Sequence, residues 1–428
     1  MRLIVAAVAF LFLTAVAMAD SSNEVAEIQA LIEEIRGKSF TAAITAQNQT
    51  LEEFEAYLDR TLAKQAQAGL AGHYETIVRA VGLYTGPPLG DFLQMTKLVM
   101  MSLAAAYYDP ETEAFSIVML DLPDMMRRPL FVHELTHGLQ DQHHDLDAYL
   151  LDMSDGTLND DELLARQSVV EGEATYVMTV ASVKDLMGIV PSRELLGLSI
   201  DMQADLSAKQ MSGMLDSSPA TRQMGGGLAE AAKAIDEIPA FMIETLLGSY
   251  LKGQAFVYAV QAGGWGAVDS LFIDPPVSTE QILHPDKYIA RELPRSFDLN
   301  SLDNRLFDGW THLHTNVMGE LQWRVVFDEH GLGDLAKSAS DGWDGDAYAV
   351  YQDDDGATLM LMATHWDTDK DADVFEAAYQ GVIDAKGGHG DVTRLMLRDR
   401  RFVGIVEGGD SRQAANRLEA MKSLAARP

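Results

Sequence analysis

The stretch that decides the expected fold reads PLFVHELTHGLQDQHHDLDAYL over residues 129–150. We expect one helix here, and it contains an H-E-x-x-H pattern that runs from His133 to His137. Residues four apart lie on the same face of a helix, so both imidazoles can face a single metal ion. Glu134 can reach a water molecule on that ion without binding the metal itself. The pattern therefore predicts a zinc site with His133 and His137 as ligands and Glu134 as the general base.

A catalytic zinc ion has three protein ligands and an open fourth position. Glu171 lies 34 residues after His137, in the sequence VEGEA. With a rise of about 1.5 Å per residue, His137 lies about 20 Å before the end of its helix, and Glu171 lies about 17 Å into the next helix. If the two helices pack antiparallel across a turn at residues 152–156, Glu171 comes level with the histidines. We therefore expect one Zn²⁺ per chain, held by His133, His137 and Glu171.

Glu173 is the competing third ligand. It is two residues from Glu171, so the two carboxylates point to different sides of a helix. Glu171 has more polar neighbours at helical spacing than Glu173 has. A metal ligand belongs on the more polar side, which favours Glu171 and leaves Glu173 as an acid that supports the ligands from behind.

These segments resemble a known family of zinc enzymes. HELTHGLQD, at residues 133–141, resembles the H-E-L-T-H-x-x-x-D segment of thermolysin-like peptidases, and EGEA, at residues 171–174, is similar to the E-G-x-A segment of aminopeptidase-type gluzincins. The resemblance covers well under a third of the chain. It implies a zincin-like fold and a gluzincin zinc metallopeptidase that hydrolyses peptide bonds. The recognition motif for a substrate's amino terminus has no match here, so aminopeptidase activity is not implied.

Carried over residue by residue, the resemblance implies the same three metal ligands and the same base, Glu134. It also implies that Asp141 orients a ligand imidazole, a role that carboxylates often have in zinc sites. Thermolysin-like enzymes stabilise the developing oxyanion with a His or Tyr from a later segment. His284 and Tyr288 are the candidates here, with a capping histidine and a packed tyrosine as the structural alternatives.

A β-hairpin is expected before the active-site helix. Two apolar runs at residues 103–108 and 115–120 flank a turn-rich segment that includes Pro110. In folds of this kind such a strand lies beside the active-site helix, and an extended peptide can add to its edge. The expected partner is therefore a peptide or protein substrate.

The chain begins like a secreted protein. Arg2 precedes an apolar run over residues 3–17, and Ala17 and Ala19 form an A-x-A cleavage pattern. This predicts a signal peptide over residues 1–19 and an exported protein, periplasmic or extracellular. The alternative is an uncleaved membrane anchor, although the run is near the short limit for spanning a bilayer.

Composition excludes several classes of function. There is no cysteine among 428 residues, which excludes thiol chemistry and cysteine-bound zinc. The formal net charge of −33 argues against nucleic acid or an anionic membrane as a partner.

The length predicts two domains of an α+β protein, because about 400 residues exceed what one core usually supports. A mainly helical zincin-like metallopeptidase domain is expected over residues 20–300. A smaller C-terminal α+β domain, to which no chemistry is assigned, is expected over residues 301–428. In the first domain we expect helices at 24–35, 51–67, 73–83, 129–150, 159–187, 195–215, 228–234 and 241–262. In the second we expect helices at 320–328, 372–384 and 411–426 and strands at 347–351, 358–364 and 402–407.

Two weaker signals remain. His143 and His144 are expected to be exposed on the active-site helix. The acidic segment at residues 367–373 imitates a calcium loop, but Ala372 and Ala378 stand where such a loop needs glycine and glutamate. The second hypothesis for the whole chain is a non-catalytic zinc-binding protein. In that case Glu173 or His143 would close the fourth position of the metal.

Overall fold

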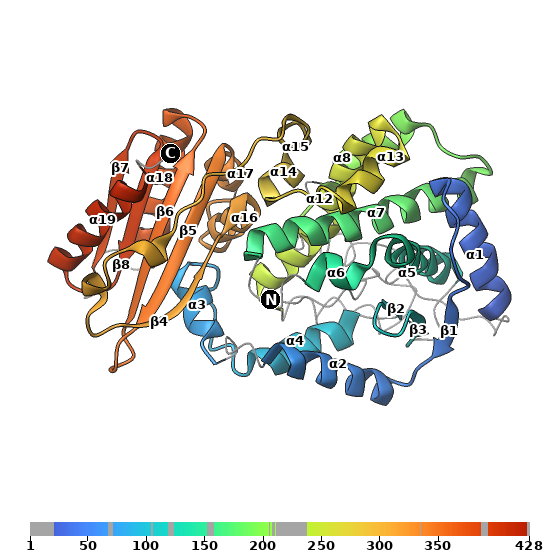
Figure 1. Cartoon of the computed structure of the whole chain (residues 1–428), viewed down its shortest axis with the longest axis horizontal. Coiled ribbons are helices and arrows are strands. Elements are labelled where there is room, and N and C mark those ends of the chain that lie inside the picture. Colours follow the sequence, from blue (N-terminus) through green and yellow to red (C-terminus); the bar gives the residue numbers. More distant parts are fainter. Residues whose placement is uncertain are drawn as a thin grey trace.

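The computed structural model describes residues 21–66, 72–103, 106–118, 124–151, 158–204, 206–207, 210, 238–333, 335–386 and 393–425. It has an α+β architecture, with a body of long helices at one end and a five-stranded sheet at the other (Figure 1). The predicted signal peptide, the turn at 152–156 and the helix at 228–234 lie outside the described residues.

The centre of the helical body is formed by α5 (Asp124–His144), α7 (Asp160–Met187) and α12 (Ala240–Val260) (Figure 1). Helices α5 and α7 run antiparallel, because residue 128 of α5 pairs with residue 185 of α7 and residue 140 pairs with residue 173. Their apolar sides share a core with α1 (Ser21–Arg36), whose predicted helix at 24–35 is confirmed.

Helix α7 begins where the sequence predicts. The Asn159 side chain accepts from the backbone N–H groups of Asp161 and Glu162, and Glu162 reaches back to the backbone N–H of Asn159. This capping box satisfies backbone donors that the first turn leaves free. The helix ends at Gly188, whose φ of 72° favours glycine.

The predicted limits of the helix that carries the H-E-x-x-H pattern are wrong at both ends. Helix α5 begins at Asp124, so Pro129 lies inside it and not in its first turn. It ends at His144, because Asp145 has a φ of 50°, and α6 (Leu146–Leu151) follows as a separate helix. The break is stabilised by the Leu146 N–H, which donates to Asp141 Oδ1 at 2.9 Å.

The predicted hairpin is present as β2 (Ala106–Asp109) and β3 (Ala114–Ile117). The structure adds a third strand, β1 (Thr45–Asn48), which pairs parallel to β3 and gives the order β1-β3-β2. The four residues of β1 read TAQN and carry no strand signal. Strand β2 is the edge strand next to α5, as Tyr108 N–H donates to Glu134 of that helix.

Further helices complete the body. The predicted helices at 51–67 and 73–83 correspond to α2 (Leu51–Ala66) and α3 (Tyr74–Ala80), whereas α4 (Phe92–Leu103) was not predicted. The first part of the helix predicted at 195–215 is present as α8 (Arg193–Ala204), and residues 211–215 lie outside the described residues. Short helices follow α12: α13 (Trp265–Asp269), α14 (Thr279–Leu283) and α15 (Pro285–Ala290).

The C-terminal sheet is antiparallel, in the order β4-β5-β6-β8-β7. Its central strands β5 (Trp343–Gln352), β6 (Thr358–Trp366) and β8 (Phe402–Glu407) match the predicted strands. The edge strands β4 (Thr311–Asn316) and β7 (Arg394–Asp399) were missed. Both are less buried than the centre and carry polar or charged residues, so neither reads as an apolar run.

Helices cover both faces of this sheet. On one face lie α16 (Gly319–Glu329), α17 (Leu335–Ser340) and α18 (Asp369–Ala385), and on the other lies α19 (Ser411–Ala425). The predicted helices α16, α18 and α19 are confirmed.

The helical body and the sheet share a hydrophobic cluster. It includes Phe241 and Leu247 of α12 together with Val350 and Met360 of the sheet. The division at residue 300 stays a prediction, and apolar packing continues across it. Within the described residues, no helix has the length and apolar character needed to cross a membrane.

Candidate metal centre

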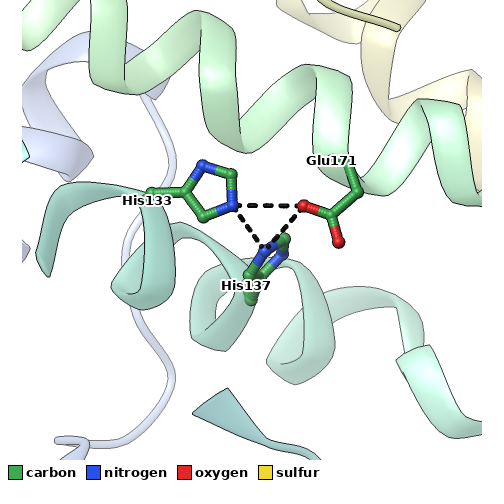
Figure 2. Close-up of side chains that lie close together, drawn as sticks. All are labelled: His133, His137 and Glu171. Carbon is green, nitrogen blue, oxygen red and sulfur yellow. Dashed lines mark hydrogen bonds and ion pairs between the residues drawn. The ribbon is translucent and has the colours of Figure 1, made fainter. Parts of the chain in front are cut away.

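Three predicted ligands meet between α5 and α7 (Figure 2). The two Nε2 atoms of His133 and His137 are 3.1 Å apart. Glu171 Oε2 lies 3.2 Å from the Nε2 of His133 and 3.5 Å from that of His137. The three residues are buried, with exposed fractions of 0 to 2%.

These distances allow a test of whether the set fits zinc. Ligand atoms that bind one tetrahedral zinc ion at about 2.0–2.1 Å lie about 3.3–3.4 Å from one another. The separations of 3.1, 3.2 and 3.5 Å fall on either side of that value. In addition, the buried Glu171 Oε1 atom has no hydrogen-bond partner among the described residues. The donor set and its spacing are those that a zinc ion would need.

Glu134 lies beside the three ligands but is held by a different element. Its Oε2 atom accepts the Tyr108 N–H of β2 at 3.0 Å. Its Oε1 atom is buried and has no partner among the described residues. Burial, reinforced by the negative charge of Glu171, raises the pKa of Glu134 to about 8. Glu134 therefore has one fixed oxygen and one oxygen that is free to exchange a proton.

The ligands perturb one another strongly. Burial lowers the pKa of His133. Burial also acts to lower the pKa of His137, but the adjacent Glu171 carboxylate outweighs it and raises that pKa to about 9. Burial would raise the pKa of Glu171, but the two imidazoles bring it down to about 2. The Glu171 carboxylate thus favours positive charge at His137.

A close approach of two helices places Glu171. A Cβ atom on Gly172 would lie 2.2 Å from the backbone carbon of Gly253 in α12, and one on Gly253 would lie 2.2 Å from the Ser168 oxygen in α7. Only glycine fits at both positions, so the second residue of the E-G-x-A segment has a packing role. Helix α12 also brings Tyr250 to the site, where its ring stacks on that of His133 with the ring centroids 5.6 Å apart.

Glu173, the competing ligand, points away from the three ligands. It accepts from Gln140 Nε2 at 2.9 Å and from Arg36 Nε of α1. Gln140 Oε1 in turn lies 2.8 Å from His137 Nδ1. Glu173 thus supports His137 through Gln140 instead of facing the other ligands. The sequence left this supporting role open for Glu173.

The expected role of Asp141 is wrong. Its carboxylate accepts from the Tyr108 hydroxyl at 2.8 Å and from the Leu146 N–H at 2.9 Å, and within the described part of the chain its partners do not include an imidazole. The side chain that contacts Nδ1 of His137 is Gln140, one position earlier than Asp141. Three residues after His137, Gln140 shares its helix face, so helical spacing could have identified it.

Neither oxyanion candidate contacts the described ligands. His284 Nε2 lies 3.0 Å from Glu320, and the Tyr288 hydroxyl donates to the backbone oxygen of Asp274 at 2.8 Å. The sequence missed Tyr250, the tyrosine that does lie at the site. No local signal marks it, because the contact depends on how α12 packs against α7.

The remaining histidines of α5 serve the surface of the helical body. His143 is exposed, as expected, and lies 2.9 Å from the Ser39 backbone oxygen. His144 is only partly exposed, which corrects the expectation, and its ring stacks on Phe272 at 4.3 Å. In the calcium-like segment, the Thr368 hydroxyl accepts the Asp371 N–H and caps α18.

Among the residues that the structure describes, two other groups, one with a histidine and one of acids alone, are close enough to hold a cation. His284, Glu320 and Asp341 form one group, and Arg324 contacts both of its carboxylates. Lys287 contacts all three acids of the other group: Glu280, Glu292 and Asp367. A basic side chain thus supplies the positive charge in each, unlike in the cluster of His133, His137 and Glu171.

Comparisons with known proteins identify only the C-terminal region. Residues 305–417 match a domain of unknown function, DUF8575, and this match spans all five strands of the larger sheet. No curated protein and no solved structure matches the chain.

Proposed function

We propose that this chain is an exported zinc-dependent metallopeptidase of the gluzincin type. His133, His137 and Glu171 would hold the ion, and Glu134 would be the general base. The observation that carries the proposal is the pairing of three mutually spaced ligand atoms with a neighbouring carboxylate that keeps one oxygen free.

A bound zinc ion lowers the pKa of its water toward about 7 and polarises a substrate carbonyl. Glu134 Oε1 would take a proton from the attacking water and deliver it to the leaving amine. Tyr108 N–H fixes the other oxygen, which keeps the carboxylate in one orientation. In the metal-free protein, burial raises the pKa of Glu134 to about 8, and the positive charge of a bound cation would lower it toward the ionised form that a general base needs.

A peptide is the substrate class that the surroundings favour. Strand β2 is an edge strand beside Glu134, and strand edges bind extended peptides through backbone hydrogen bonds. Its four residues are buried and its Tyr108 N–H is paired with Glu134, so a peptide would align along the remaining part of this edge. Tyr250, a buried side chain stacked on His133, adds an aromatic ring beside the candidate ligands. No chemistry is assigned to the C-terminal sheet.

The competing function, a structural zinc site in a binding protein, needs a fourth protein ligand. The sequence offers Glu173 or His143 for that position. Glu173 is engaged with Gln140 and Arg36, and His143 lies at the Ser39 backbone oxygen. Three ligands with a neighbouring base favour the catalytic site.

The test compares wild type with Glu134→Gln. Zinc stoichiometry is measured by elemental analysis, and cleavage of casein and a peptide library is measured with and without a chelator. We expect Glu134→Gln to keep its zinc and to lose at least about 100-fold in kcat, the range of one general base. Glu27→Gln, an exposed change on α1, is the matched control and should cleave like wild type. Cleavage that Glu134→Gln leaves unchanged would refute the mechanism.

A further inference from the structure

A line of buried polar side chains connects the candidate metal centre to the N-terminal helix. It starts at His137 Nδ1, which lies 2.8 Å from Gln140 Oε1. Gln140 Nε2 donates to Glu173 Oε2 at 2.9 Å, and Arg36 Nε of α1 donates to the other oxygen of Glu173. These four side chains are 0 to 3% exposed, so bulk water does not replace any of the hydrogen bonds between them.

The hydrogen bonds of Gln140 allow only one orientation of its amide. Its nitrogen lies 3.0 Å from the backbone oxygen of Val170 as well as 2.9 Å from Glu173. A carbonyl and a carboxylate can only accept, so the donating NH₂ group must face them. The amide oxygen must then face His137, and an amide oxygen accepts but does not donate.

It follows that the Nδ1 atom of His137 carries a proton. In a neutral imidazole the other nitrogen, Nε2, then keeps its lone pair. Nε2 is the atom that lies 3.1 Å from His133 Nε2 and 3.5 Å from Glu171. The contact of Gln140 with Nδ1, on the opposite side of the ring, thus selects the tautomer whose Nε2 can bind a metal.

Arg36 fixes the far end of the line. Its guanidinium is permanently charged, and it also donates to Asp269 Oδ1 at 2.8 Å and stacks on Trp265 at 4.1 Å. Both contacts hold the guanidinium in one place, and with it the Glu173 carboxylate.

We propose that Gln140, Glu173 and Arg36 form a positioning relay that holds His137 in its Nδ1–H tautomer, ready to bind a metal through Nε2. This inference rests on the proposed function, because it assigns the residues that prepare one of the proposed ligands. It also replaces the role that the resemblance implied for Asp141, which contacts Tyr108 and Leu146.

Glu173→Gln tests the relay with almost no change in volume. A glutamine here cannot serve both neighbours, because Arg36 and the Gln140 amide nitrogen are both donors and the new side chain has only one accepting end. If its oxygen turns to Arg36, its NH₂ group faces the NH₂ group of Gln140, and two donors cannot pair. This contact favours a flipped Gln140 amide, and only the Val170 carbonyl then still holds the original orientation. The flipped amide would present NH₂ to His137 Nδ1 and select the wrong tautomer.

Two further variants make the test specific. Gln140→Met removes the acceptor from His137 with an apolar side chain of similar length, and it introduces no charge. Asp141→Asn is the matched control. It makes the same kind of acid-to-amide change as Glu173→Gln, at the residue that follows Gln140 on α5, and it leaves the relay intact. Circular dichroism of each variant verifies that it is folded.

Zinc affinity is measured on the full chain by competition with a chromophoric chelator. Loss of a residue that orients a metal ligand typically costs 10- to 100-fold in affinity. We expect that loss for Glu173→Gln and Gln140→Met, and a change below about threefold for Asp141→Asn. Equal, small effects in all three variants would overturn the relay, and so would a large loss confined to Asp141→Asn.

A second measurement does not depend on zinc. Histidine-selective ¹⁵N NMR of the metal-free protein at pH 10 reports which nitrogen of His137 carries the proton, with His137→Gln used for assignment. We expect Nδ1–H in wild type and a shift toward Nε2–H in Glu173→Gln. If wild type binds no zinc, the proposed function fails and this spectrum alone decides the relay. The same tautomer in both proteins would refute it.

Discussion

Replacing Gly172 by alanine tests whether the crossing of α7 and α12 sets the position of Glu171. The added Cβ would lie 2.2 Å from the backbone carbon of Gly253, 2.3 Å from its oxygen and 2.7 Å from its Cα. Carbon atoms in good contact lie about 3.5–4.0 Å apart. The two helices must therefore separate by more than about 1 Å, since both partners are backbone and cannot rotate away.

The expected cost follows from two opposing effects. Forcing a methyl group into a packed interface costs about 1–3 kcal/mol. Alanine is about 1 kcal/mol better than glycine inside a helix, which offsets part of that cost. We expect Gly172→Ala to lower the free energy of unfolding by up to about 2 kcal/mol. It should also weaken zinc binding, because the Tyr250 contact with His133 depends on α12.

Gly381→Ala is the matched control. Gly381 lies inside α18, and a Cβ there would meet only Leu332 side-chain carbons at 3.8 and 3.9 Å, which is ordinary contact. This variant should be up to about 1 kcal/mol more stable than wild type. Urea unfolding followed by circular dichroism gives both values. Gly172→Ala with the stability of Gly381→Ala would refute the argument from close approach.

Three further outcomes are expected. Glu171 raises the pKa of His137 to about 9 in the metal-free site, so zinc must displace a proton at neutral pH. Apparent zinc affinity, measured by chelator competition, should therefore rise about tenfold per pH unit up to about pH 9. An affinity that is constant between about pH 7 and 9 would contradict this. Asp346→Asn should destabilise the protein by about 2–3 kcal/mol in urea unfolding, because an amide can accept at only one end. Both buried oxygens of Asp346 accept N–H groups, which come from Met318, Gly319, Trp323 and Trp343. Stability equal to that of wild type would show that these bonds contribute nothing. Amino-terminal sequencing of protein recovered from outside the cytoplasm should begin at Asp20, and a chain that still begins at Met1 would rule out the predicted cleavage.

Much of the local structure could be read from the sequence. The capping box at Asn159 places the start of α7, and apolar runs identify the central strands β5, β6 and β8. The break after His144 could not be read in the same way, because it depends on Asp145 taking a left-handed conformation that other residues stabilise. The edge strands β1, β4 and β7 lack an apolar run of strand length. Whether these segments form strands depends on the neighbouring strand with which each one pairs.

For the candidate site, the spacing of His133 and His137 determined by itself that both rings share one face of a helix. That follows from the helical repeat, which is a local property of the backbone. Only the tertiary structure decided that Glu173 supports the site through Gln140 and Arg36, and that Tyr250 covers His133. These contacts join residues far apart in the chain, such as Arg36 and Glu173, and they depend on the packing of whole helices, which no local repeat encodes.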